Sequence, residues 1–173
     1  MARELLGKVL VHGECAGVIV ETEAYTNDGD LAAHSAAGIT PRTKVIFGPP
    51  GHAYVYLSYG VHECFNIVAE PEGHAGCVLI RALQPVAGLD IMRARRPAEK
   101  KDHRLASGPG NLTRVMGITR TLYGRDMTEG DFVVREDFVQ SPFEVEVTTR
   151  IGITKTVDLP FRFLIGGNPS VSR

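Results

Sequence analysis

The segment from Glu21 to Tyr25 carries two carboxylates and an aromatic ring at every second position. In a β-strand this spacing places Glu21, Glu23 and Tyr25 on one face. The other face carries Val18, Val20, Thr22 and Ala24. With the apolar face on the core, the acids and the ring would lie side by side on an open face. A carboxylate there could activate a water beside a stacked ring. A half-buried strand with solvated acids is the alternative that this segment, taken alone, favours.

A second aromatic group lies on a predicted hairpin, formed by residues 52–57 and 62–69. Strand alternation places Tyr54, Tyr56 and Ser58 on one face, and Tyr59 at the tip beside Gly60, which supplies the turn. An exposed aromatic residue at a tip carries a hydrophobic cost unless something receives it. Tyr59 therefore either folds back on its own strands or acts as a wedge in a stack of bases.

Asn66 is a polar residue in the apolar return strand of this hairpin, between Phe65 and Ile67. The same alternation puts it on one face with His62 and Cys64. A buried amide must be paired, so Asn66 either braces the backbone or contacts the edge of a ligand.

Length and composition indicate one globular domain with its own core: 173 residues, 43% hydrophobic and 23% charged. The beginning has no long apolar run, so we expect no signal peptide or membrane span, and an intracellular protein, cytoplasmic or nucleoid-associated if bacterial. Three widely spaced cysteines suit a reducing compartment and form no zinc pattern with the histidines, so we predict no metal site. These cysteines and histidines are Cys15, Cys64 and Cys77, with His52, His62 and His74.

The net charge of −1 does not suggest nucleic acid, but the distribution of charge is uneven. Acids crowd the first thirty residues, whereas basic residues cluster from position 93 onward. Such a run is usually a solvated helix face, and it could also be a footprint for phosphates. The basic residues are Arg93, Arg95, Arg96, Lys100, Lys101, Arg104, Arg114, Arg120 and Arg125.

Strands outnumber helices in the predicted elements, and no regular alternation of strand and helix is present. This pattern predicts an α+β fold with a mainly antiparallel sheet. The expected helices cover residues 1–6, 86–95 and 111–116, and the expected strands cover 8–12, 17–25, 52–57, 62–69 and 76–83, followed by strand-like alternation from 132 to 165.

Several motifs together resemble the alkyladenine (3-methyladenine) DNA glycosylase family, the type of mammals and many bacteria that lacks a helix-hairpin-helix domain. The resemblance implies a single catalytic domain over residues 1–173, on a curved antiparallel sheet with a protruding β-hairpin and a few helices. Members of the family usually carry a further stretch before the first helix that has no match here, so we expect either a short form or a trimmed start. In chain order the motifs are Glu21–Tyr25, Ala32–Ser35, Thr40–Arg42, Tyr54–Gly60, Asn66, Leu79–Leu83, Ser107–Gly110 and Arg150–Ile153.

The implied activity is hydrolysis of the N-glycosidic bond of an alkylated or otherwise modified purine in double-stranded DNA, by a monomer without a cofactor. Glu23 matches the general base that deprotonates a water, and Arg81 matches the residue that helps to hold it, with a main-chain carbonyl near Ile153. The resemblance places no lysine in the pocket, Lys44 being the nearest in sequence. We therefore expect no Schiff-base lyase step.

The resemblance also implies how a flipped base is held. Tyr25 would stack on one face of the base, with His34 and Tyr56 on the other. Asn66 matches the residue that crowds the exocyclic amino group of guanine. Tyr59 matches the tip residue that enters the duplex.

Two departures from the family bear on these roles. Glu63, beside the hairpin tip, would repel phosphates and could weaken the wedge. The connection from Ile153 to Asp158 is short, and it borders the expected water site.

Two other functions stay open from the residues alone. A non-catalytic binder of damaged nucleic acid could keep the stacking pocket without needing Glu23. A small-molecule glycosidase could use Glu21 and Glu23 as an acid and base pair. An exposed tip tyrosine and a basic run are features that a small substrate does not require.

Overall fold

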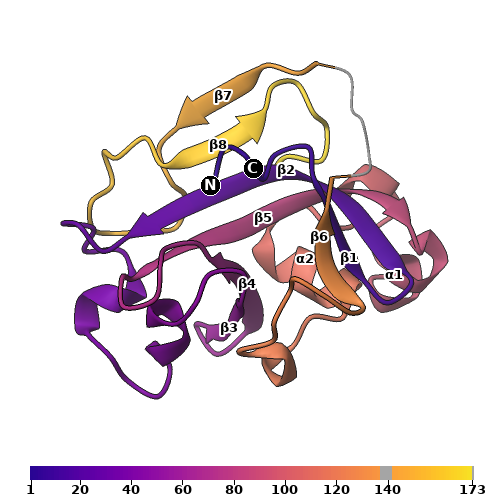
Figure 1. Cartoon of the computed structure of the whole chain (residues 1–173). Helices are drawn as coiled ribbons and strands as arrows, with labels where there is room; N and C mark the ends of the chain where they lie inside the picture. Colours follow the sequence, from indigo (N-terminus) through magenta and orange to yellow (C-terminus); the bar gives the residue numbers. More distant parts are fainter. Residues whose placement is uncertain (137–141, 173) are drawn as a thin grey trace.

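The computed structural model describes residues 1–136 and 142–172 and builds them around one antiparallel sheet (Figure 1). Its strands run in the order β3-β4-β5-β2-β1-β6, and β8 joins β2 and carries β7. The strands are β1 (Val9–His12), β2 (Cys15–Thr26), β3 (Ala53–Ser58), β4 (His62–Val68), β5 (Gly76–Ala87), β6 (Phe132–Arg135), β7 (Val145–Thr148) and β8 (Arg162–Ile165).

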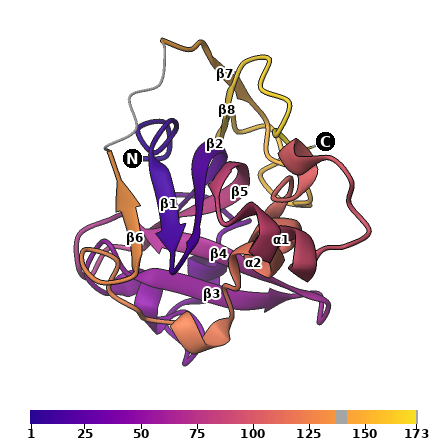
Figure 2. The same cartoon turned by 90° about the vertical axis from the view of Figure 1, so that its right-hand side faces the viewer.

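The long strand β2 is the centre of this arrangement. It pairs with β5 along one edge, while its other edge is shared by β1 at the beginning and by β8 around Glu21–Glu23. The sheet bends strongly, so β3 and β4 run across the direction of β1 and β2 (Figure 2). Segments from both ends of the sequence therefore meet at the middle of β2.

The pairing of β2 with β5 is interrupted beside the two acids. Ile19 pairs with Leu83 and Glu21 with Ala82, so Val20 is an extra residue on β2. The next pair joins Thr22 to Ile80, which leaves Arg81 as an extra residue on β5. Such bulges redirect side chains, and they often lie next to functional sites.

Two helices, α1 (Leu89–Arg95) and α2 (Pro109–Met116), pack on one side of the sheet (Figure 1). The apolar face of α2, with Leu112, Val115 and Met116, is fully buried in the main hydrophobic core. Short 3₁₀ helices occupy His34–Ala37, Lys44–Phe47, Asp102–Arg104 and Arg120–Leu122. Among the described residues, neither helix has the length and apolar run that crossing a bilayer would require.

The predicted fold class is confirmed, including the curved antiparallel sheet and the hairpin of β3 and β4. One predicted helix is wrong, and another is wrong in part. Residues 2–7 form turns instead of a helix, and β5 continues through Pro85 to Ala87, so that α1 begins only at Leu89. Pro85 fits in this strand because it pairs with Gly17 at a shift of register, where the ladder is already irregular.

Candidate active site

A pocket of about 590 Å³ opens between the hairpin, the loop after β2 and the loop before β8. Six of the seven residues proposed from the sequence line this pocket. The exception, Glu23, lies directly behind the lining and is fully buried. The six are Tyr25, His34, Tyr56, Tyr59, Asn66 and Arg81.

Aromatic rings form one wall of the pocket. The rings of His34 and Tyr56 meet edge to face with centroids 4.5 Å apart, and Tyr54 lies behind them, 5.3 Å from Tyr56. The guanidinium of Arg42 lies over the Tyr56 ring at 5.0 Å from its centroid. Tyr54 comes from the strand face predicted to carry it and is held by a second small core, which includes Ile46.

The hydrogen bonds of His34 fix its protonation state. Its Nε2 lies 3.3 Å from Nη2 of Arg42, which can only donate, so this nitrogen accepts. Its Nδ1 therefore carries the proton and donates to the hydroxyl of Tyr54 at 2.7 Å. Burial, with the nearby Arg42, lowers the pKa of His34 to about 4. The imidazole on this wall is neutral at physiological pH.

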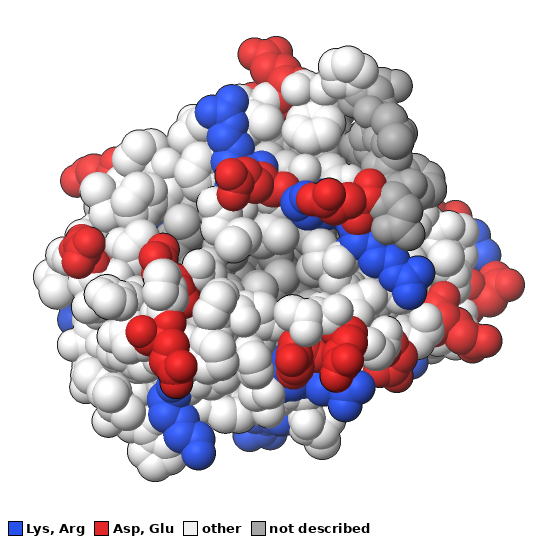
Figure 3. All heavy atoms as spheres, in the orientation of Figure 1, with Lys and Arg blue, Asp and Glu red and all other residues white. Residues whose placement is uncertain are grey.

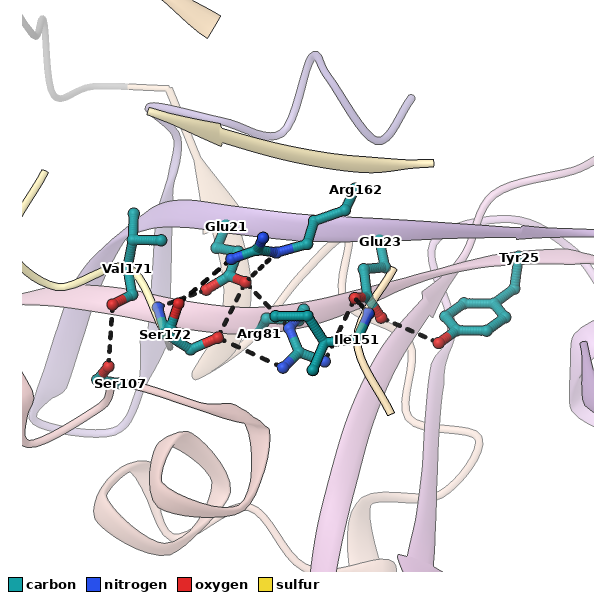
Figure 4. A network of polar contacts seen from close by, with 9 residues as sticks. All are labelled: Glu21, Glu23, Tyr25, Arg81, Ser107, Ile151, Arg162, Val171 and Ser172. Carbon is teal, nitrogen blue, oxygen red and sulfur yellow. Dashed lines mark hydrogen bonds and ion pairs between the residues drawn. The ribbon is translucent and has the colours of Figure 1, made fainter. Parts of the chain in front are cut away.

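Glu23 is held at both of its oxygens (Figure 4). The hydroxyl of Tyr25 donates to Oε2 at 2.9 Å, and the backbone N–H of Ile151 donates to Oε1 at 2.8 Å. Nη1 of Arg81 lies 3.4 Å from the same Oε1. Burial and the neighbouring carboxylate raise the pKa of Tyr25, so its hydroxyl stays protonated and remains a donor.

Glu21 occupies a different environment from that expected. It accepts hydrogen bonds from Arg81, Arg162 and Ser172, and no part of it is exposed. The prediction of an open face carrying both acids is therefore wrong. The prediction failed because the arginines that pair with the acids lie far away in the sequence, where strand alternation alone could not place them.

A second buried ion pair supports Tyr25 from behind. Arg150 binds both carboxylate oxygens of Asp30, at 2.6 and 2.8 Å, and its guanidinium lies 4.6 Å from the centre of the Tyr25 ring. The same carboxylate accepts a hydrogen bond from Thr156 at 2.9 Å. This pair joins the two loops that flank the pocket, and it places Ile151 beside Glu23.

Asn66 lies in the pocket wall, and each end of its amide has a partner. Its Nδ2 donates to the backbone oxygen of Tyr54 at 3.2 Å, and its Oδ1 lies 3.7 Å from the thiol of Cys77. Burial raises the pKa of Cys77 to about 12, so the thiol remains protonated and can donate. Asn66 thus both braces the hairpin and contributes to the lining, so the two readings of this residue are compatible.

The hairpin tip presents Tyr59 to solvent, with 87% of the residue exposed. Its φ is +49°, a left-handed conformation that is uncommon for a residue with a side chain, and Gly60 follows at +70°. The neighbouring Glu63 is bound by Arg120 at 2.9 Å, so its charge is paired and its expected repulsion of phosphates is reduced.

The basic run is largely used within the protein. Acidic and basic side chains are interspersed on the face drawn in Figure 3, where they form no continuous basic strip. The structure thus favours a solvated face with paired charges over a footprint for phosphates. The contacts are Arg93 with Asp90 and Asp102, Arg95 with Val115, Arg96 with Arg104 and Glu99, Arg114 with Arg95, and Arg125 with Asp131.

The structure adds residues that the sequence reasoning missed. Lys155 is exposed and lines the pocket, so the expectation of a pocket without lysine is wrong. Arg150 and Ile151 belong to one of the family motifs, but the resemblance assigned them no role. Membership of that motif is the only feature of the sequence that pointed to them. Among the described residues, no group of three or more histidines, cysteines or acids comes together as a metal site.

Comparison with known proteins identifies the family of the chain. The family model for methylpurine-DNA glycosylase matches residues 1–169. A protein of Methanoculleus marisnigri named "Putative 3-methyladenine DNA glycosylase" is 50% identical over 179 residues, covering 100% of this chain and 92% of the relative. Proteins with the same name from Koribacter versatilis and Nitrosospira multiformis are 49% and 46% identical, covering 99% and 100% of this chain and 86% and 88% of theirs. The chain belongs to the methylpurine-DNA glycosylase family.

Proposed function

We propose that this protein is a monofunctional DNA glycosylase that takes a modified purine, flipped out of double-stranded DNA, into the pocket and hydrolyses its N-glycosidic bond. The observation that supports this most directly is the position of Glu23. Glu23 lies at the back of an aromatic pocket, next to the guanidinium of Arg81. Residues 1–173 would act as one catalytic unit.

Glu23 is the proposed general base for the attacking water. The N–H of Ile151 and the guanidinium of Arg81 orient its carboxylate, and a carboxylate can also stabilise positive charge on the sugar. Its Oε2 accepts one hydrogen bond from Tyr25 and has a further lone pair for a water. Arg81 would hold that water from the pocket side, with a backbone carbonyl near Ile153.

The base would lie between Tyr25 on one face and His34 and Tyr56 on the other. A neutral imidazole and two tyrosines suit an alkylated purine, which often carries positive charge. Each such cation–π contact is worth about 0.5–2 kcal/mol. Asn66 would crowd the 2-amino group of guanine, and Tyr59 would fill the gap left in the duplex.

We propose that the reaction ends at the abasic site even though Lys155 lines the pocket. A lysine becomes a nucleophile when burial or another cation neutralises it. Lys155 is exposed, which suits contact with a phosphate instead. Borohydride reduction during turnover would trap a covalent enzyme–DNA product only if a Schiff base forms, and we expect none.

The small-molecule glycosidase fits the site less well. It requires Glu21 to act as an acid beside Glu23, but Glu21 already accepts four hydrogen bonds from arginine and serine groups. With both oxygens occupied as acceptors and no exposed surface, Glu21 does not reach a substrate in the pocket.

The decisive test uses duplex oligonucleotides that each carry one modified purine. After incubation with enzyme, alkali cleaves the strand at any abasic site. We expect wild-type protein to cleave at least one of these substrates and Glu23→Gln to lose about 10²–10⁴-fold of the rate. The variant should bind the same duplexes with unchanged affinity, because the amide keeps the shape of the acid. Absence of cleavage on every lesion by wild-type protein would refute the proposal.

A further inference from the structure

Glu21 is fully buried two residues before Glu23, and it contacts Arg81 more closely than Glu23 does. Nε of Arg81 donates to Oε1 of Glu21 at 3.0 Å, whereas Nη1 lies 3.4 Å from Oε1 of Glu23. Figure 4 shows the guanidinium between the two acids. Glu21 is therefore the principal partner of the cation that faces the pocket.

Ser172 completes this arrangement from a distant part of the chain. Its N–H donates to Oε2 of Glu21 at 2.7 Å, and its hydroxyl donates to Oε1 at 2.9 Å. The same hydroxyl oxygen accepts Nη2 of Arg81 at 3.3 Å. The segment is anchored one residue earlier, where Ser107 donates to the carbonyl of Val171 at 3.3 Å.

We propose that Glu21 and Ser172 are positioning residues that hold Arg81 for catalysis. They bind its Nε and Nη2, so that Nη1 alone is directed toward Glu23. The inference rests on the proposed function, because it assigns Arg81 the task of holding the attacking water beside Glu23.

The backbone does not perform this task by itself. Arg81 is the extra residue in a bulge of β5, without a register partner on β2. A bulged residue is oriented by its side-chain contacts more than by the ladder of backbone hydrogen bonds. Those contacts are supplied by Glu21 and Ser172.

Glu21 also prevents Arg81 from neutralising Glu23 completely. A free guanidinium beside a carboxylate tends to form two parallel hydrogen bonds to it. Such a fork on Glu23 would occupy the oxygen positions that a water needs. With Glu21 and Ser172 holding two nitrogens, only one nitrogen approaches Glu23, at a distance longer than an ideal hydrogen bond.

The charges of this region are balanced only when Glu21 is included. Two acids, Glu21 and Glu23, face two arginines, Arg81 and Arg162, whose side chains are 8% and 12% exposed. Nε of Arg162 donates to Oε1 of Glu21 at 2.7 Å. Loss of the Glu21 charge would leave Glu23 as the remaining acid in contact with Arg81, which favours the unproductive fork.

The test is a double-mutant cycle measured by single-turnover excision. We expect Glu21→Gln and Ser172→Ala each to lower the excision rate by about 10-fold or less while lesion-DNA affinity is unchanged. The Arg81→Lys background keeps the charge but removes Nε. In that background either change should lower the excision rate further by less than about 2-fold. Equal losses in both backgrounds would show that these residues act independently of Arg81 and would overturn the proposal.

Thr22→Val is the matched control. Thr22 lies on β2 between the two acids, is fully buried, and donates its hydroxyl to the carbonyl of Ala2 at 2.9 Å. Its loss removes a buried hydrogen bond without touching Arg81. A fall in excision as large as that of Ser172→Ala would indicate a general structural effect and would contradict the positioning role.

A spectroscopic measurement separates this proposal from the proposed function. The Nε–H of Arg81, assigned by its loss in Arg81→Lys, should exchange slowly in wild-type protein and rapidly in Glu21→Gln and Ser172→Ala. If wild-type protein excises no lesion, the proposed function fails, whereas the exchange rates still report whether Glu21 and Ser172 hold Arg81. Slow exchange that persists in both variants would overturn the positioning role even in an active enzyme.

Discussion

The hydroxyl of Tyr25 and Oε2 of Glu23 are joined by a hydrogen bond of 2.9 Å. The ring proposed to stack on the base and the acid proposed to activate the water therefore belong to one unit. Binding of a base against Tyr25 would also set the direction in which Glu23 presents its remaining lone pair.

Two substitutions of Tyr25 separate stacking from this hydrogen bond. Tyr25→Phe keeps the ring and should excise within about 10-fold of wild type, because Ile151 and Arg81 still hold Glu23. Tyr25→Ala loses the stack as well, worth roughly 1–3 kcal/mol, and should fall a further 5- to 150-fold. Single-turnover excision on one lesion substrate provides the comparison. Equal impairment of the two variants would assign the role to the hydroxyl.

Asn66 is expected to limit the choice of base. Asn66→Ala or Asn66→Ser removes a side chain that lines the pocket, and should admit bases with a 2-amino group. The measurement is release of undamaged guanine from mismatched duplexes, normalised to the excision of a modified adenine. If guanine release stays at the wild-type level, Asn66 serves only to brace the hairpin through Tyr54.

Tyr59 is expected to assist flipping. Tyr59→Ala should weaken binding to lesion duplex and slow excision by about 5- to 150-fold, with almost no change in melting temperature, because the side chain is exposed. The defect should shrink when the lesion lies in a bulge or mismatch, where flipping costs less. Val61→Ala, which alters another exposed apolar residue near the tip, is the control. A lower melting temperature with equal impairment on paired and unpaired lesions would make Tyr59 a packing residue.

The buried pair of Asp30 and Arg150 should matter for stability. Asp30→Asn leaves Arg150 as a buried charge without its partner, which should cost about 3–5 kcal/mol of unfolding free energy. The equivalent change at Asp102, in an exposed pair with Arg93 that solvent screens, should cost far less. Urea denaturation of the two variants measures the difference. Similar losses at the two sites would contradict the role given to the buried pair.

His34 predicts a specific dependence on pH. Its pKa is about 4 in the folded protein against 6.5 for the free side chain, so between these values the unfolded chain takes up a proton that the folded protein does not. Stability should therefore fall as the pH drops from about 6.5 to about 4. His34→Gln should reduce the loss measured by urea denaturation between pH 7 and pH 5. An unchanged loss would show that His34 is protonated in the folded state at pH 5.

The sequence predicted elements whose signals are local. Alternation located the strands β1 to β5, and Gly60 located the turn of the hairpin, because both depend on neighbouring residues. The bulges at Val20 and Arg81 could not be predicted, since they arise from the pairing of two strands some sixty residues apart. The same limit explains the error at Pro85, where a bulged ladder tolerates a residue that normally ends a strand.

The candidate site shows the same division. Tyr25, Tyr56 and Asn66 were found from their faces on predicted strands, and the structure places them in one pocket. The environment of Glu21 was not found, because Ser172 lies 151 residues away and no local pattern connects them. The family resemblance carried information on Arg81 that strand periodicity does not contain.

The separation of Glu21 from Ser172 has a consequence for synthesis of the enzyme. The residues proposed to stack on the base leave the ribosome early, whereas the segment that supplies Ile151, Arg162 and Ser172 emerges much later. Contacts of such long sequence separation are slow to form, and domains assemble as the chain becomes available. Until that segment docks, Glu21 and Arg81 lack the serine that joins them. We expect nascent chains to acquire excision activity only once this segment has emerged and docked, and not gradually during elongation.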